Sequence, residues 1–368
     1  MNVPAFDLRR AVARIADPLA ERWRKIQENT SFILGPEVKE FEEAFARYLG
    51  ATGTIGVANG TDALVVALRA LGAGPGDEVV IPAFSFFATA EAVVLVGATP
   101  VFADVDPATL NLDPVDAGER ITARTVGVLG VHLYGRPFDV EAIRGLCDRH
   151  GLWMVEDAAQ AHGAAVRGRR VGTFGELTAW SFYPTKNLGC FGDGGALSGM
   201  DAKILDKARR IANHGQVARY QHAEVGVNSR LDSLQAAVLN CRLPLLEGDN
   251  GRRREVACRY HGALAGLADL RLPVDPEGST CVYHQMTLLT SRREALMAHL
   301  AARGIGHSIH YPSPLHRQEA LRDAIGAIPD LPVAERAAKE VLCLPMFPEI
   351  TDAEVDATTA AIRDFFAA

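Results

Sequence analysis

The chain has 368 residues, of which 48% are hydrophobic and 23% are charged, as is usual for a folded globular protein. Its formal net charge of −7 argues against a general nucleic-acid-binding protein, which needs a basic face, but allows a locally positive pocket for a small anion. A chain of this length exceeds one small core and predicts two domains.

The cysteines and the hydropathy pattern bear on the compartment. Six cysteines are scattered without a CxxC pair, which favours reduced thiols in a cytosol over disulfides or a zinc site. The first 26 residues lack the continuous apolar stretch of a signal peptide. Residues 84–102 are the most apolar, but they include Glu91 and Pro100 and so predict a buried helix and strand rather than a membrane span. We expect a soluble, cytoplasmic protein.

From about residue 37, helical patterns alternate with short β-branched runs. Helices are predicted at residues 37–50, 61–72, 87–97 and 139–151. Strands are predicted at residues 54–59, 77–83, 99–105, 125–135 and 152–158. Strand–helix–strand units at this spacing predict a mainly parallel sheet with helices on both faces. Ligands of such sheets bind at the carboxyl ends of the strands.

The pattern changes after a long helical region at residues 234–264. It is followed by predicted strands at 283–290 and 305–312 and predicted helices at 292–304 and 353–366. We therefore expect a large domain over residues 1–245, which includes the N-terminal segment, and a smaller α+β domain over residues 246–368.

The segment SFYPTKNLGCFGDGG, residues 181–195, holds a single lysine, Lys186, with aromatic and apolar residues around it and no charge beside it. A desolvated lysine loses part of its proton affinity and becomes a nucleophile toward carbonyl groups. The alternative is a lysine on a loop rim, with its stem on apolar surface and its head in water. The segment alone does not decide between them.

Two features at predicted strand ends are candidates for binding a phosphate. Gly60, Thr61 and Asp62 follow a strand and open a helix, where free N–H groups and the helix dipole hold anions. A plain N-cap is the alternative there. Ser181, at the end of a strand-like run, is either a second phosphate donor or a turn residue.

An apolar strand also ends in two carboxylates, Glu156 and Asp157. A carboxylate in this position points into the ligand cleft, unless it caps the helix that follows. Lysine, carboxylate and phosphate cup together fit pyridoxal phosphate, which also needs an aromatic ring on its face. Phe86, just past a predicted strand, supplies that ring. Asp157 is needed because only a protonated ring nitrogen makes the cofactor an electron sink.

The order of motifs resembles the DegT/DnrJ/EryC1/StrS family of sugar aminotransferases, a branch of the aspartate-aminotransferase-like, fold-type I enzymes. The resemblance covers nearly the whole chain and rests on VANGTDAL, PAFSFFATAEAV, VEDAAQAHGA, SFYPTKNLGCFGDGG, NHGQ, VGVNSRLDSLQAAVL and HYPSPLH, among others. It implies an α/β fold with a mainly parallel seven-stranded sheet between helices and a smaller C-terminal α+β domain. Lys186 matches the family's Schiff-base lysine.

The resemblance also implies roles for individual residues. Asp157 would hold the pyridinium nitrogen, Gln160 would contact the ring hydroxyl and Phe86 would stack on the ring. The phosphate would be bound by Thr61, Ser181 and the backbone at Gly60 and Asp62.

Further residues match the family's subunit contacts and sugar pocket. Asn228 matches an asparagine that reaches the phosphate from the neighbouring subunit, which implies a homodimer with shared sites. The residues in segments that line the sugar pocket are His162, Tyr183, His214, Arg219, His310 and Tyr311.

The sequence also bears on several alternative functions. A dehydratase branch of the family has histidine at the position of Lys186, so lysine favours amino transfer. The glycines of residues 72–80 follow a helix and precede a strand, the reverse of a dinucleotide-binding fingerprint. His307 and His310 would point to opposite faces of a strand, so we expect no metal site. A non-catalytic regulatory or binding protein on this fold stays a different-class alternative.

The region around NHGQ is most similar to enzymes that aminate the 3-keto position of a nucleotide-linked sugar. We therefore expect an aminotransferase that converts a dTDP- or UDP-linked 3-keto sugar to the 3-amino sugar, with L-glutamate as donor and pyridoxamine phosphate formed during turnover. Amination of a 4-keto sugar is the alternative.

Overall fold

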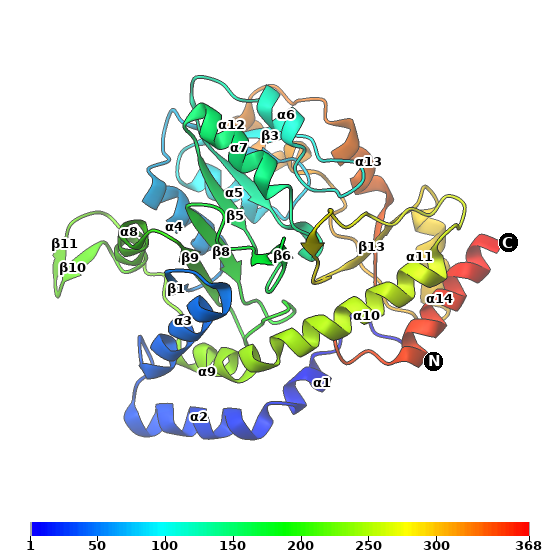
Figure 1. Cartoon of the computed structure of the whole chain (residues 1–368), viewed down its shortest axis with the longest axis horizontal. Helices are drawn as coiled ribbons and strands as arrows, with labels where there is room; N and C mark the ends of the chain where they lie inside the picture. Colours follow the sequence, from blue (N-terminus) through cyan, green and yellow to red (C-terminus); the bar gives the residue numbers. More distant parts are fainter. Residues whose placement is uncertain (1, 368) are drawn as a thin grey trace.

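The computed structural model describes residues 2–367 and is built around a seven-stranded sheet (Figure 1). The strand order is β1-β9-β8-β5-β4-β2-β3. β9 runs antiparallel to both of its neighbours, and the other neighbouring pairs are parallel. The predicted mainly parallel seven-stranded sheet is thus confirmed. The strands are β1 (Gly53–Val57), β2 (Glu78–Pro82), β3 (Thr99–Ala103), β4 (Thr125–Val131), β5 (Trp153–Asp157), β8 (Leu177–Ser181) and β9 (Gly195–Gly199).

Helices cover both faces of this sheet, because alternate residues of its strands enter different cores. Val79 and Ile81 pack with α4, α5 and α8, whereas Val80 between them packs with α6 and α7. The helices of the first face are α4 (Gly60–Leu71), α5 (Ala88–Leu95) and α8 (Ala202–Ala212). Those of the second face are α3 (Pro36–Leu49), α6 (Pro114–Glu119), α7 (Val140–His150) and α9 (Ser233–Arg242).

The helix α10 (Leu246–Leu264) leads from α9 toward the C-terminal elements (Figure 1). There β13 (Met286–Leu289) pairs antiparallel with β14 (Val341–Leu344). The helices of this region are α11 (Arg293–Ala302), α13 (Pro332–Glu340) and α14 (Asp352–Ala367). Two short helices, α1 (Leu8–Ala13) and α12 (Arg322–Ile325), and the longer α2 (Ala16–Asn29) complete the set of α-helices among the described residues.

Short strands lie outside the two main sheets. β6 (Ala165–Val166), β7 (Arg169–Arg170) and β12 (Ser279–Thr280) form a small sheet, and β10 (Gln216–Ala218) and β11 (Gln221–His222) form a hairpin. The prediction of a strand at residues 305–312 is wrong. Ile305 and Ser308 form only isolated bridges, to Val3 and Cys343, and the prolines that follow at 312 and 314 have no N–H for a ladder.

The two packing units do not follow the expected division at residue 245. Val3 is fully buried in the C-terminal core and bridges to Ile305, so the first residues pack with the smaller unit. Conversely, Leu331 and Ala334 join the core of the large sheet. Hydrophobic burial, not chain position, sets this exchange of segments.

Residues 2–367 lack two features, a membrane-spanning helix and a cluster of metal-binding side chains. None of their helices is long and apolar enough to cross a membrane. They also contain no group of three or more histidine, cysteine or acidic side chains placed to hold a metal ion.

Candidate active site

Lys186 lies on the loop that connects β8 to β9, and its apolar neighbours hold this loop in the protein core. Phe182 and Leu188 are fully buried. The Phe182 N–H donates to the Gly194 carbonyl at 2.7 Å, and the Cys190 N–H donates to the Phe182 carbonyl at 2.7 Å. The residues beside the lysine are therefore apolar because they fix its loop in the protein core.

The amine of Lys186 is held in a poorly solvated position. Burial lowers its pKa from an ordinary value of 10.5 to about 8, while the Asp157 carboxylate acts in the opposite direction. The lysine cation in turn helps to lower the pKa of His162, His284 and His310, although burial is the larger cause for each. These histidines are therefore neutral neighbours of the amine.

Asp157 ends β5 and is 7% exposed. Its carboxylate accepts the Ala159 N–H at 3.1 Å and the Thr89 hydroxyl at 3.3 Å. Burial raises the pKa of Asp157, and the Ala159 N–H and the Lys186 charge oppose that rise. Thr89 was not found from the sequence, because it lies 68 residues away and matches no local pattern.

Glu156 does not point into the same cleft, contrary to expectation. Successive side chains of a strand face opposite ways, and this carboxylate is fully buried on the other face of β5. It faces His132 Nε2 at 3.1 Å and accepts four further hydrogen bonds from the segment that precedes and enters β8. Those donors are the N–H groups of Gly172, Phe174 and Gly175 and the hydroxyl of Thr178.

The predicted phosphate donors meet at the start of α4. Gly60 lies so close to Ser181 that a Cβ atom on the glycine would be 2.7 Å from the serine Cβ. The helix is capped by Asn59, whose side chain accepts the Asp62 N–H at 2.8 Å. Asp62 therefore does not offer its backbone donor, which corrects the sequence prediction. Within residues 2–367 the N–H groups of Gly60 and Thr61 have no hydrogen-bond acceptor and stay available.

A cluster of aromatic side chains and one amide side chain surrounds Tyr311. Phe86 is 55% exposed, and its ring centroid lies 5.8 Å from that of Tyr311. Gln160 donates to the Tyr311 hydroxyl at 3.1 Å and accepts the Tyr134 N–H at 2.6 Å. His310 is the residue before Tyr311, and its carbonyl accepts the Tyr134 hydroxyl. The structure thus brings four of these predicted residues, Phe86, Gln160, His310 and Tyr311, together.

Two other residues predicted to contact the sugar differ in their exposure. His162 has no exposed surface and packs against Trp180 and Phe182, with ring centroids 5.2 and 5.7 Å away. It is therefore enclosed rather than presented to a substrate. Tyr183 is 53% exposed at the start of the lysine loop.

His214, Arg219 and Asn228 belong to a part of the chain that leaves the body of the molecule. The hairpin of β10 and β11 projects beyond α8 (Figure 1). Arg219 lies at its tip, with its guanidinium over the Tyr220 ring at 5.1 Å. His214, just before the hairpin, and Asn228, which bridges to Asn213 after it, are exposed. The sugar-contacting roles of Arg219 and His214 stay predictions.

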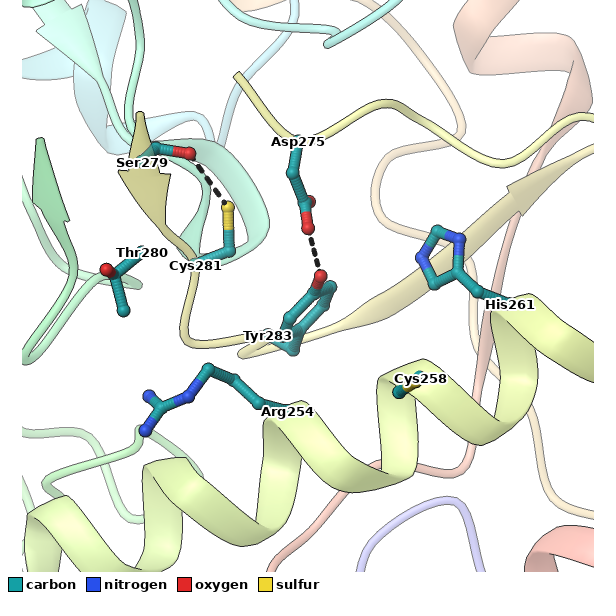
Figure 2. Close-up of a pocket in the computed structure, with 8 residues that line it drawn as sticks. All are labelled: Arg254, Cys258, His261, Asp275, Ser279, Thr280, Cys281 and Tyr283. Carbon is teal, nitrogen blue, oxygen red and sulfur yellow. Dashed lines mark hydrogen bonds between the residues drawn. The ribbon is translucent and has the colours of Figure 1, made fainter. Parts of the chain in front are cut away.

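A pocket of about 530 Å³ opens elsewhere, between α10 and the segment before β13. Figure 2 shows Arg254, Cys258 and His261 on the helix, facing Asp275 and Tyr283. The Asp275 carboxylate is already engaged by the Tyr283 hydroxyl and by Arg136. The residues predicted for cofactor or sugar do not line this pocket.

The residues around Lys186 fit a phosphorylated pyridine aldehyde. A buried amine with a lowered pKa is a nucleophile for the aldehyde. A buried carboxylate suits a pyridinium N–H. The Gly60–Ser181 contact places free helix N–H groups beside a hydroxyl, which suits a phosphate. His284, buried at 6% exposure near the lysine, is a further neighbour that sequence reasoning missed.

Comparison with known proteins points the same way. The chain is 44% identical to the dTDP-3-amino-3,4,6-trideoxy-alpha-D-glucose transaminase of Streptomyces venezuelae, over 99% of this chain and 96% of that protein. It is 42% identical to the UDP-2-acetamido-2-deoxy-3-oxo-D-glucuronate aminotransferase of Pseudomonas aeruginosa, over 98% and 99%. The crystal structure of S. venezuelae DesV in complex with a ketimine intermediate matches with a TM-score of 0.97 and 43% identity, over 100% of this chain and 99% of that one.

The family model for DegT/DnrJ/EryC1/StrS aminotransferases matches residues 14–363, which include every residue placed at the site above. With the sheet, the lysine loop and the acid at the end of β5 in place, the chain belongs to the DegT/DnrJ/EryC1/StrS aminotransferase family.

Proposed function

We propose that this protein aminates the 3-keto group of a nucleotide-linked sugar, with L-glutamate as amino donor and pyridoxal phosphate as cofactor. The observation that carries this proposal is the half-buried Lys186, whose amine has its pKa lowered to about 8, near Asp157. The two transaminases described above support the position on the ring, because both are named for 3-amino or 3-oxo sugars. They differ in the nucleotide, so dTDP and UDP are both candidates.

Each residue of the site has its own role in the proposed amino transfer. The Lys186 amine, with its pKa lowered to about 8, would hold the cofactor through its aldehyde. When bound, pyridoxal phosphate supplies an electron sink for the carbanion left when the donor loses its α-proton. The Lys186 amine would take and return that proton at Nζ. Asp157 keeps the ring nitrogen protonated, and the Gly60 and Thr61 N–H groups with Ser181 hold the phosphate.

We propose that two chains complete each site. The hairpin region exposes apolar side chains, with Tyr220 at 80% and Val225 at 83% exposure, next to the exposed Asn228. Exposed apolar groups on a projecting element favour a protein partner. A second copy of this chain would receive the hairpin, so that Asn228 reaches the phosphate and Arg219 and His214 reach the sugar of the partner's site.

Two further points define the proposal. All six cysteines are free thiols, which supports a reducing compartment such as the cytoplasm. The lysine with its lowered pKa and the buried acid favour catalysis over a purely regulatory or binding role for the fold. Amination at the 4-keto position stays the alternative within the enzyme class.

Lys186 should be the residue that carries the cofactor. Borohydride reduction of the purified protein should fix the cofactor to the peptide that contains Lys186, and peptide mass spectrometry identifies it. In the cofactor-free chain, trace acetylation of Lys186 should rise with pH to a midpoint near 8, because only the free amine reacts. The exposed Lys203 is the internal control, and its acetylation is followed in the same samples. Cofactor fixed at another lysine contradicts the assignment.

Asp157→Asn should bind the cofactor yet lower turnover by roughly a hundredfold or more, because an amide cannot hold the ring proton. The same variant should shift the acetylation midpoint of Lys186 below 8, since the carboxylate now raises that pKa. Steady-state rates and the acetylation profile test the two effects separately. Turnover near that of the native enzyme would falsify the role given to Asp157.

Activity should be restored when two inactive variants are mixed. Each dimer of a Lys186→Ala chain with an Asn228→Ala chain has one site with both native residues, so random reassociation at equal amounts restores about a quarter of the sites. Mixing Lys186→Ala with the Lys186→Ala/Asn228→Ala double variant is the control and should restore none. If the first mixture only averages its parents, Asn228 does not act in the partner's site.

The sugar is tested with dTDP- and UDP-linked 3-amino and 4-amino sugars in the reverse reaction with 2-oxoglutarate. We expect glutamate to form from 3-amino sugars at least roughly tenfold faster than from 4-amino sugars, because a pocket that hydrogen-bonds one ring position leaves polar groups unpaired with the other. Mass spectrometry of the sugar product measures both. A preference for 4-amino sugars would replace the ring position and keep the enzyme class.

A further inference from the structure

A buried asparagine on α10 lies where three segments of the active site meet. Asn250 is fully buried. Its Nδ2 donates to the His162 carbonyl at 2.7 Å, and its Oδ1 accepts from Asn187 Nδ2 at 2.9 Å. Asn187 is the residue after Lys186, and the same Nδ2 donates to the Val282 carbonyl at 2.9 Å. The asparagine pair therefore ties the lysine loop to the turn after β5 and to the segment before β13.

The hydrogen bonds leave one orientation for both amides. Backbone carbonyls accept at each end of the pair, at His162 and at Val282, so each must face an NH₂ group. The NH₂ group of Asn187 then also donates to Asn250, whose side-chain oxygen accepts the hydrogen bond. The other oxygen, Asn187 Oδ1, is buried without a hydrogen-bond partner in residues 2–367. No donor there would therefore favour the flipped orientation of the Asn187 amide.

The backbone around the pair is shaped to admit it. Gly163 has φ +91°, and a Cβ atom at this position would lie 2.6 Å from Asn250 Nδ2. A side chain at residue 163 would therefore push the asparagine away from the His162 carbonyl. The turn that follows Asp157 approaches α10 closely at this point.

We propose that Asn250 is a positioning residue for Lys186, acting through the Asn187 side chain. The proposal rests on the function assigned above, in which the Lys186 amine must meet a cofactor ring held by Asp157. Without the Asn250 oxygen, Asn187 keeps only the Val282 carbonyl and the lysine loop gains freedom. The amine then becomes more hydrated and less well aligned, since alignment within fractions of an ångström governs such reactions.

The chain contains a matched control. Asn240 is 8% exposed on α9, its Nδ2 makes two hydrogen bonds to Glu37, and its Oδ1 is buried without a partner, as in Asn187. Asn240→Ala therefore removes a comparable buried amide that does not contact the lysine loop. Both variants should lower the melting temperature, and only Asn250→Ala should change Lys186.

The first measurement is the acetylation midpoint of Lys186 in the full chain freed of cofactor, which needs no enzyme activity. Titratable groups that influence the amine in the native chain are Asp157, His162, His284 and His310, and all are kept. Greater hydration favours the charged amine, so Asn250→Ala should raise the midpoint from about 8 by at least half a pH unit. Asn240→Ala should leave it in place. A midpoint unchanged in Asn250→Ala overturns the proposal.

A double-mutant cycle tests whether the effect passes through Asn187. If it does, Asn187→Ala and the Asn187→Ala/Asn250→Ala double variant should raise the midpoint equally, and each should slow borohydride-trappable cofactor uptake roughly tenfold. Additive shifts in the double variant would contradict the route through Asn187. A native protein that takes up no cofactor would instead refute the proposed function, whatever the midpoints are.

Discussion

The enclosure of one amine and one carboxylate in the same poorly solvated space is the constraint on which the rest of the site depends. Removal from water disfavours the charged form of both groups, so burial lowers the pKa of Lys186 and raises that of Asp157. Their mutual attraction acts against both shifts. The result is a lysine close to half-protonated near pH 8 and an acid supported by Thr89 and the Ala159 N–H. An amine chemistry at moderate pH follows from this balance.

The end of β5 explains how such a pair is kept in place. Asp157 and Glu156 are consecutive, and the strand sends them to opposite faces. The fully buried Glu156 carboxylate binds the segment before β8 and faces His132 at the end of β4. Five donors compensate for its burial, so the neighbouring strands are joined beneath the site. One carboxylate holds the framework, and the adjacent one lies within the electrostatic influence of Lys186.

Much of the site was predictable because the parallel sheet collects strand ends at one edge. From that rule and the family resemblance, the sequence predicted one site that contains Lys186, Asp157, Gly60 and Ser181. The same rule could not tell which of two adjacent carboxylates faces the ligand, because the strand's exact phase decides it.

Other parts had no signal in the sequence. Thr89 and Asn250 contact the site from distant positions, and a single polar residue in a helical pattern looks like many others. The strand predicted at residues 305–312 showed a suitable pattern but pairs with other segments only through two isolated bridges. The hairpin that carries Arg219 projects from the body of its own chain, and no pattern in the sequence indicated this.

The reversed direction of β9 has a consequence for the lysine loop. Because β8 and β9 pair antiparallel, the chain leaves the sheet after Ser181 and re-enters the same edge at Gly195. A parallel successor would have required a long crossover along the full length of the sheet. Lys186 is thus carried on a closed loop whose two ends, at Ser181 and Gly195, pair with each other in the sheet. The conformational entropy of closing such a loop is lost during folding, when the sheet forms, rather than at each encounter with a ligand.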